Sequence, residues 1–148
     1  MRRRHPALEP SAWAESTGSR LRVLVEHHDP TIGLAIGNLL TAEGYDVSNC
    51  AGPDDRGRRR CSLTAGEGCA LGSEADVIVF GLNISDEADR AILREWREGH
   101  PGIPVVVEIP TSRIPFYRDE LEGCVTVPQP MTREALLVAL THALANPR

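Results

Sequence analysis

The chain has 148 residues, of which 41% are hydrophobic and 25% charged, and its formal net charge at pH 7 is −5. This length fits one globular domain, and the negative charge offers no overall attraction to nucleic acid or to an anionic membrane. All 16 basic residues are arginine, so no lysine amine is available for a Schiff base, a general base or a phosphate clamp.

The N-terminal sequence predicts a tail rather than a leader. Residues 1–19 mix Arg, Pro, Ser and Glu without a period, which predicts a disordered tail before a domain at 20–146. No apolar run of about 7–15 residues follows the first arginines, and nowhere do about 18 apolar residues run together. We therefore expect a cytoplasmic protein with no membrane span and with reduced thiols at all four cysteines: Cys50, Cys61, Cys69 and Cys124.

The first regular elements follow this tail. Residues 22–26 form a short β-branched run that predicts a buried strand, and the polar residues 27–30 follow at its end. Apolar residues spaced by three and four from Ile32 to Leu40 predict a helix, which Asp29 caps and Gly44 ends. Residues 45–47 then predict a second strand.

The pattern dissolves between Gly52 and Ser73. Gly, Pro and Asp are frequent there, arginines gather at 56–60, and the apolar residues are scattered. This composition predicts a long irregular connection.

Regular elements resume with the strongest strand of the chain, at 75–81, whose unbroken apolar run is typical of the middle of a parallel sheet. We expect a helix over 86–98, a strand over 103–108, a loop with a short helix over 110–123 and a strand over 124–127. A closing helix over 132–145, capped by Thr132, ends the domain. The inward side chains are expected to be Ala88, Ala91, Ile92, Leu93 and Trp96 in the first of these helices and Leu136, Leu137, Leu140 and Leu144 in the second.

This alternation of strands and helices predicts an α/β domain with a doubly wound parallel sheet of five strands. In such a sheet ligands bind at the carboxyl ends of the strands. Those ends are residues 27–29, 81–83, 109–110 and 128–130.

The same four ends resemble those of the response-regulator receiver (CheY-like) family. Residues 23–30 resemble the first strand and its acidic-pair loop, residues 76–84 the third strand and the loop beyond it, and residues 104–110 the fourth strand. Residues 127–130 resemble the Lys-Pro corner after the fifth strand. The resemblance covers about residues 21–144 and implies a flavodoxin-like fold with strand order 2-1-3-4-5.

The resemblance also implies that the family's phosphorylation site has degenerated. Its acidic pair holds Mg²⁺, an aspartate accepts the phosphoryl group, and a Ser or Thr and a Lys bind the transferred oxygens. The corresponding positions carry none of these side chains: they are His27 and His28, Gly81, Ile109 and Gln129. We therefore expect no phosphoaspartate chemistry, no catalytic residue, no metal and no cofactor.

A scaffold without that chemistry most often binds another protein. The resemblance implies a stand-alone pseudo-receiver, a phosphorylation-independent, non-enzymatic interaction module in bacterial signal transduction or transcriptional control. Its expected partners are a kinase, a receiver, a transcription factor or a second copy of the chain. The expected partner surface spans the fourth helix, fifth strand and fifth helix of the family and includes Thr126, Gln129, Met131 and Arg133.

Several residues leave other functions open. His27, His28 and Asp29 could bind a transition metal, although adjacent side chains of an extended chain point to opposite sides. The cysteines lack a Cys-x-x-Cys pair, yet they or the vacated site could serve a small-ligand, metal or redox sensor, which is the main alternative.

Two glutamates and the arginine clusters complete the candidates. Glu26 and Glu108 occupy the last apolar places of two strands, and we expect each to reach solvent, since burial would raise its pKa. Arginines 2–4 and 58–60 could touch phosphates, but no nucleic-acid motif accompanies them, so we expect no nucleic-acid partner.

Overall fold

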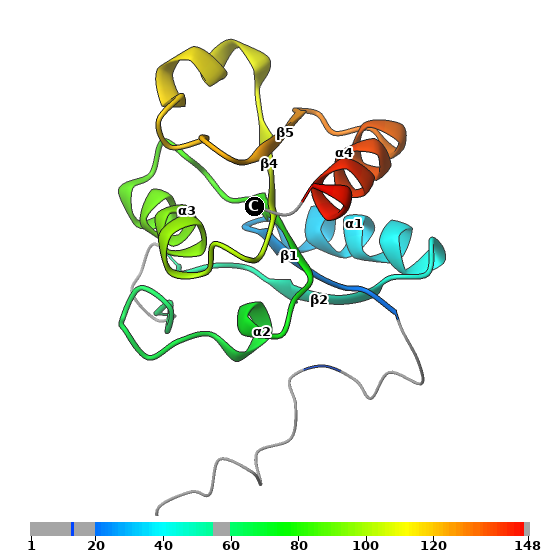
Figure 1. Cartoon of the computed structure of the whole chain (residues 1–148), viewed down its shortest axis with the longest axis horizontal. Helices are drawn as coiled ribbons and strands as arrows, with labels where there is room; N and C mark the ends of the chain where they lie inside the picture. Colours follow the sequence, from blue (N-terminus) through cyan, green and yellow to red (C-terminus); the bar gives the residue numbers. More distant parts are fainter. Residues whose placement is uncertain (1–12, 14–19, 55–59, 147–148) are drawn as a thin grey trace, which may run out of the picture.

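The computed structural model describes Trp13 and residues 20–54 and 60–146. Strands and helices alternate along these residues (Figure 1). The elements are β1 (Arg22–His27), α1 (Pro30–Ala42), β2 (Asp46–Cys50), α2 (Ala70–Ser73), β3 (Val77–Gly81), α3 (Glu87–Gly99), β4 (Val105–Ile109), the 3₁₀ helix η2 (Thr111–Tyr117), β5 (Val125–Pro128) and α4 (Arg133–Ala145).

The five strands form one parallel sheet in the order β2-β1-β3-β4-β5. Val23 pairs with Val77, and Ile78 pairs with Val105, so the most apolar strands occupy the centre. Parallel strands joined by crossovers are covered on both faces, which explains why these runs are almost purely apolar. The predicted fold class, a doubly wound five-stranded parallel sheet with the order 2-1-3-4-5, is confirmed.

Alternation along the strands divides the core between the two faces of the sheet. Val23 and Val25 point to the face covered by α1 and α4, which we call the first face. Leu24 and Phe80 point to the opposite, second face, which is covered by α3, α2, residues 60–69 and η2 (Figure 1). All four cysteines pack against the second face.

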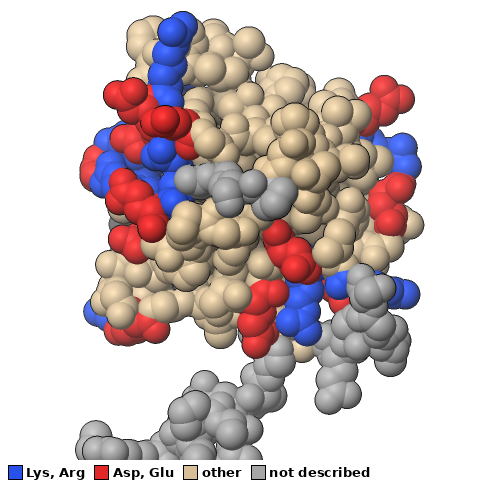
Figure 2. Space-filling view, viewed as in Figure 1, with Lys and Arg blue, Asp and Glu red and all other residues tan. Residues whose placement is uncertain are grey.

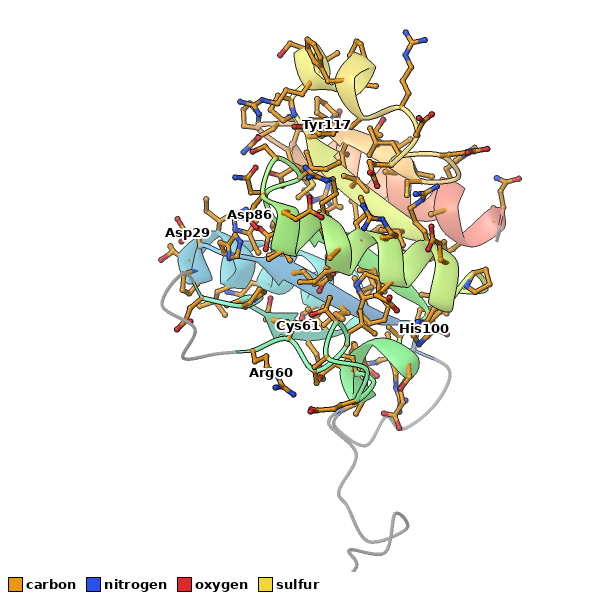
Figure 3. All side chains as sticks on the ribbon, turned by 90° about the vertical axis from the view of Figure 1, so that its left-hand side faces the viewer. Asp29, Arg60, Cys61, Asp86, His100 and Tyr117 are labelled. Carbon is orange, nitrogen blue, oxygen red and sulfur yellow. The ribbon has the colours of Figure 1, made fainter. Side chains whose placement is uncertain are left out.

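The helices begin where the sequence places capping side chains. Asp29 accepts a hydrogen bond from the Thr31 N–H at 2.9 Å, and Thr132 accepts one from the Ala135 N–H at 3.1 Å. Both predicted caps are therefore present. Asp86 caps α3 in the same way, and Figure 3 shows Asp29 and Asp86 at the same end of the sheet. The carboxyl ends of β1 and β3 thus lie beside two helix starts.

The segment between β2 and β3 is irregular, as predicted, over its described residues. It forms turns at 62–66 and ends in α2, a helix of four residues, while residues 55–59 lie outside the description. Leu63 from these turns is buried in the core of the second face. Most of the predicted tail 1–19 also lies outside the description, but Trp13 is buried against the same core and donates its indole N–H to the Leu71 carbonyl at 3.1 Å.

Two helices turn slightly differently from the prediction. In the first turn of α3, Asp89 points inward in place of the predicted Ala88: Asp89 is 2% exposed, whereas Ala88 is exposed. In α4, Leu137 and Leu144 were predicted to be buried but are half-buried. The fully buried residues of this helix are Leu136, Ala139, Leu140 and Ala143. Small residues at two of these places let α4 lie close to the sheet.

Charged side chains gather toward the margins of the side shown in Figure 2, and uncharged residues occupy much of its centre. Within residues 20–54 and 60–146, no helix is long and apolar enough to cross a membrane.

Candidate functional site

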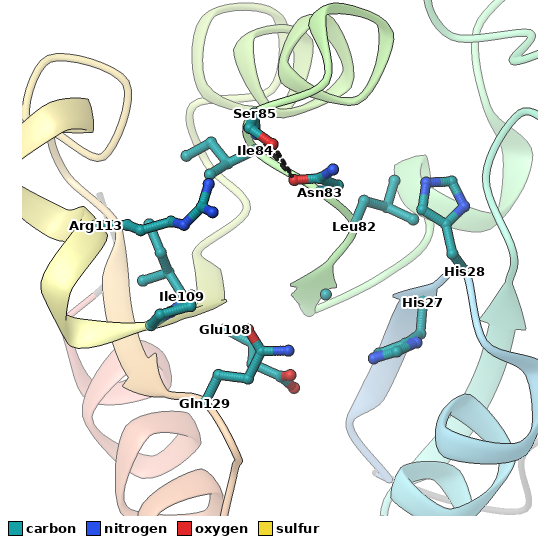
Figure 4. Close-up of a pocket in the computed structure, with 12 residues that line it drawn as sticks. His27, His28, Leu82, Asn83, Ile84, Ser85, Glu108, Ile109, Arg113 and Gln129 are labelled. Carbon is teal, nitrogen blue, oxygen red and sulfur yellow. Dashed lines mark hydrogen bonds between the residues drawn. The ribbon is translucent and has the colours of Figure 1, made fainter.

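A cavity of about 360 Å³ opens at the carboxyl ends of β1, β3, β4 and β5 (Figure 4). It brings together all five positions predicted from the family resemblance, which lie up to 102 residues apart in the sequence, counting from 27 to 129. They are His27, His28, Gly81, Ile109 and Gln129. Leu82, Asn83 and Pro110, which also line it, belong to the strand ends predicted to bind ligands, whereas Ile84, Ser85 and Arg113 were not predicted.

A side chain at Gly81 would require His27 to move. A Cβ atom built on it would lie 2.8 Å from His27 Cδ2 and 3.0 Å from the Glu26 carbonyl oxygen. His27 pairs with Gly81 across β1 and β3, so the imidazole occupies the space where a side chain from β3 would project. A real Cβ essentially never approaches another atom this closely, and the glycine and the histidine therefore depend on each other.

His28 is held in a polar network at the rim of the cavity. Its Nε2 lies 2.5 Å from Asp89 Oδ2, and its Nδ1 lies 2.9 Å from the Ala51 carbonyl oxygen. Asp89, which is almost fully buried, also accepts a hydrogen bond from the Asn83 N–H at 3.0 Å. Both ring nitrogens face oxygen atoms, so the imidazole is held at two points. The network fixes the loops after β2 and β3 relative to α3.

Glu108 and Arg113 supply opposite charges to the same cavity. Glu108 is half-buried, and burial raises the pKa of its carboxyl above the ordinary value while the nearby His27 partly opposes that rise. Arg113 extends from η2 into the cavity (Figure 4). The sequence gives no periodic signal for Arg113, because a 3₁₀ helix in a predicted loop does not reveal which side chains point inward.

The donor set does not fit the Mg²⁺ ion that the receiver family implies. Magnesium takes oxygen ligands, but His27 and His28 provide nitrogens where the acidic pair would stand. The side-chain oxygen of Asn83 is already engaged by Ser85, which donates both its hydroxyl at 2.6 Å and its N–H at 3.1 Å. Among the described residues, no group of three His, Cys, Asp or Glu side chains could hold a metal ion.

Glu26 corrects a prediction. It was expected to reach solvent at the end of its strand, but it is 3% exposed and lies on the second face of the sheet. Its carboxyl accepts a hydrogen bond from the Trp96 indole N–H at 2.9 Å. Burial raises its pKa to about 8; the bond from Trp96 opposes the rise and the charge of Asp89 adds to it. Glu26 is therefore a neutral acid at pH 7.

The predicted partner surface is only partly exposed. Thr126, Gln129 and Arg133 are exposed, whereas Met131 is half-buried and packs against the core of the first face. Arg133 forms an ion pair with Glu43 at the end of α1.

Phe116 belongs to η2, which follows β4 at the place where the receiver family has its fourth helix, and its side chain is 81% exposed. Phe116 was not predicted as a surface residue, because a single phenylalanine in a loop belongs to no periodic pattern that would distinguish a surface residue from a core residue.

No family model matches this chain, and no curated protein matches it by sequence. Solved structures do match. A receiver domain protein from Clostridium thermocellum is 20% identical with a TM-score of 0.65, over 84% of this chain and 94% of that one. Chemotaxis protein CheY4 from Vibrio cholerae is 20% identical with a TM-score of 0.62, over 85% of this chain and 100% of that one. The chain has the CheY-like receiver fold.

A third similar structure is a putative pilus assembly protein from Burkholderia thailandensis, at 20% identity and a TM-score of 0.64 over 85% of this chain and 99% of that one. Likeness at this identity shows the fold alone. The receiver fold nonetheless explains why residues so distant in sequence meet at one cavity, since the carboxyl ends of parallel strands meet at one edge of the sheet.

Proposed function

We propose that this chain is a stand-alone pseudo-receiver that binds a protein partner without being phosphorylated and without catalysing a reaction. The observation that carries the proposal is the packing of His27 against Gly81. The position that corresponds to the phosphoacceptor has no side chain, and the neighbouring imidazole fills the space that one would need. The loss of the acidic pair and of the lysine agrees with that substitution.

The partner surface would lie around β5, the edge strand of the sheet, where η2 and α4 flank it (Figure 1). Phe116 supports this location, because a large exposed aromatic side chain is the kind of anchor that dominates protein interfaces. Thr126 of β5 and Gln129 directly after β5 add exposed polar groups to this surface. We propose a kinase, a receiver or a transcription factor as the partner; a second copy of the chain is an alternative outcome.

The phosphorylation half of the proposal is tested by incubating the protein with acetyl phosphate and Mg²⁺ and measuring intact mass. We expect no phosphoryl adduct on the wild-type chain. The matched control restores the family's side chains at the five positions: His27→Asp, His28→Asp, Gly81→Asp, Ile109→Thr and Gln129→Lys. An adduct on the restored variant would show that the assay detects transfer on this scaffold, and an adduct on any wild-type aspartate would contradict the proposal.

The interaction half is tested by affinity capture of the tagged protein from its native cell extract, followed by binding measurements with the purified partner. Phe116→Ala should weaken binding at least tenfold, because hot-spot aromatics contribute about 2 kcal/mol or more. Leu34→Ala removes an exposed apolar side chain from α1, at 58% exposure, and should leave binding unchanged. Equal effects of the two substitutions would place the interface elsewhere.

Arg133 needs its own control because it pairs with Glu43. Arg133→Ala removes both the charge at the surface and the ion pair, whereas Glu43→Ala removes the ion pair alone. We expect only Arg133→Ala to weaken partner binding. Similar losses in both variants would show that the ion pair, rather than the arginine itself, matters.

A further inference from the structure

A second cavity lies on the second face of the sheet and is lined by a different set of residues from the carboxyl-end cavity. It measures about 230 Å³, and most of its lining is apolar. Leu24 and Glu26 of β1 form part of it, Ile92 and Trp96 of α3 another part, and Cys61 and Leu63 of the irregular segment close it. The short helix α2 and these turns thus leave enclosed space over the sheet.

One polar side chain points into this apolar space. Glu26 is 3% exposed, and among the described residues its carboxyl receives one hydrogen bond, from the Trp96 indole N–H to Oε1. Because burial raises its pKa to about 8, the group keeps its proton at pH 7 and has an O–H to donate. The cavity therefore presents one carboxyl group that can form a hydrogen bond with a ligand.

The thiols in the lining act as small apolar groups. Burial raises the pKa of Cys50 and of Cys69 above the ordinary thiol value, so both are protonated and weakly nucleophilic at pH 7. Each sulfur accepts a backbone N–H, from Gly52 and Gly72 respectively. Among the described residues no three ligating side chains are placed to hold a metal ion, which argues against a thiolate metal site.

The mouth of the cavity disfavours a cationic ligand. Arg60 lines it, and its guanidinium lies 2.5 Å from the carboxylate of Glu67. Figure 3 shows Arg60 and Cys61 beside each other on the side of the molecule where α3 lies. A cationic amine would find no free carboxylate in the paired Arg60 and Glu67, and it would need Glu26 to ionise in an apolar site, which is costly.

We propose that this cavity binds a neutral, predominantly apolar small molecule whose carbonyl oxygen accepts a hydrogen bond from the Glu26 carboxyl group. The apolar lining contributes affinity through burial, and the single hydrogen bond fixes the orientation of the ligand. This site does not depend on the partner surface around β5, so either proposal can fail without the other.

Acetophenone is a suitable probe, with cumene as the analogue that lacks the acceptor and 1-phenylethylamine as the cationic analogue. The chain has two tryptophans, so the two indole N–H signals in a ¹⁵N-edited NMR spectrum report the site directly. We expect acetophenone to shift the Trp96 signal saturably and more than the Trp13 signal, whose indole N–H donates to the carbonyl of the cavity-lining Leu71. Cumene should bind about tenfold more weakly, and the amine should not bind.

Two variants assign the interaction. Glu26→Met removes the donor while it keeps the length of the side chain, so it should abolish the preference for acetophenone over cumene. Cys61→Phe fills the cavity from its mouth and should abolish binding, whereas Ala65→Phe adds the same ring at an exposed neighbour and should not. Thermal melting of each variant establishes that it folds.

Direct contacts keep the test decisive if a variant does not fold. Intermolecular NOEs from the phenyl protons of acetophenone should reach the Trp96 ring and the Leu63 methyl groups in the wild-type protein. The proposal is overturned if the Trp96 signal shows no saturable shift up to the solubility limit of acetophenone, or if NOEs appear at other sites. Equal affinities for acetophenone and cumene would overturn the role of Glu26.

Discussion

The two faces of the sheet are covered by different kinds of structure. On the first face, α1 and α4 cover valines and leucines, and every buried side chain of that cluster is apolar. On the second face, a four-residue helix, turns and a 3₁₀ helix stand beside α3, and the buried groups include Glu26 and Asp89. Among the described residues the first face buries no charged side chain, although a pocket also lies between α1 and the end of β2 there. The irregular cover of the second face leaves a cavity and buries two acids, each with a specific partner.

This difference locates the features that are particular to the chain. The first face stabilises the fold mainly through burial of apolar side chains, which is proportional to the apolar area removed from water and insensitive to pH. The second face adds hydrogen bonds and titrating groups whose contributions change with pH and with small changes of shape. Substitutions on the two faces should therefore differ in kind as well as in size.

The largest loss is expected on the first face from Leu140→Ala. Leu140 is fully buried, and its truncation leaves a cavity between α4 and the sheet. The free energy of unfolding should fall by about 4 kcal/mol, by a similar amount at pH 5 and pH 8. Val138→Ala on the same helix, at 70% exposure, should change it by less than about 0.5 kcal/mol. Urea titrations at pH 5 and pH 8 measure both changes. A loss at Leu140 that depended strongly on pH would contradict the proposed difference between the two faces.

Gly72→Ala should be the next most damaging, through overpacking on the second face. A Cβ at Gly72 would lie 1.8 Å from Cη2 of Trp96, so the indole would have to move from its place against Glu26. We expect a loss of about 3 kcal/mol. Gly102→Ala is the control, because nothing lies within 4 Å of its added Cβ. A mild effect at Gly72, measured by the same denaturation, would mean that the cavity absorbs the displaced ring.

Glu26→Gln should remove a pH dependence. The pKa of Glu26 is raised by folding from 4.5 to about 8, so its contribution to stability is fully present below pH 4.5 and is lost as the pH rises toward 8. The neutral glutamine cannot ionise, so the stability of the variant relative to wild type should rise over that window, by about 3 kcal/mol between pH 5 and pH 8. Thermal unfolding from pH 5 to pH 8 measures this gain. A constant difference between the two proteins would contradict it.

The smallest effect is expected at the rim of the carboxyl-end cavity. His28→Ala removes one partner of the buried Asp89, which keeps the hydrogen bond from the Asn83 N–H. Because the His28 side chain is 41% exposed, water replaces part of the lost interaction, and the cost should be about 1 kcal/mol. His27→Ala should cost about half as much or less, although it frees the space beside Gly81. Chemical denaturation distinguishes the two, and equal losses would mean that the network with Asp89 contributes nothing specific.

The sequence predicts the first face well because periodic apolar residues and caps are local signals. The apolar run at 77–80 identifies the central strand, and Asp29 and Thr132 identify helix starts that the structure places within one residue. The order of the strands follows from the family resemblance rather than from periodicity, since pairing across the sheet is not a local property.

The second face resists prediction because its polar contacts join residues far apart in the chain. Glu26 looks like the solvent-facing end of a strand, and only the indole of Trp96, 70 residues away, shows that it is covered. Asp89 is absent from the inward side chains predicted for α3, and an aspartate on an inward stripe is unfavourable unless a partner such as His28 is present. The turns at 62–66 cover the sheet through the single buried Leu63, which leaves no period to detect.

The placement of all four cysteines against the second face has a practical consequence for following the motions of this protein. All four thiols are half-buried, so the rate at which each reacts with an alkylating reagent in the folded protein, relative to the unfolded chain, measures how well the segment over it protects it. The first face contributes no thiol to that rate. The protein thus carries its own set of chemical reporters, confined to one layer of the domain, and labelling them in turn would show in what order that layer comes apart.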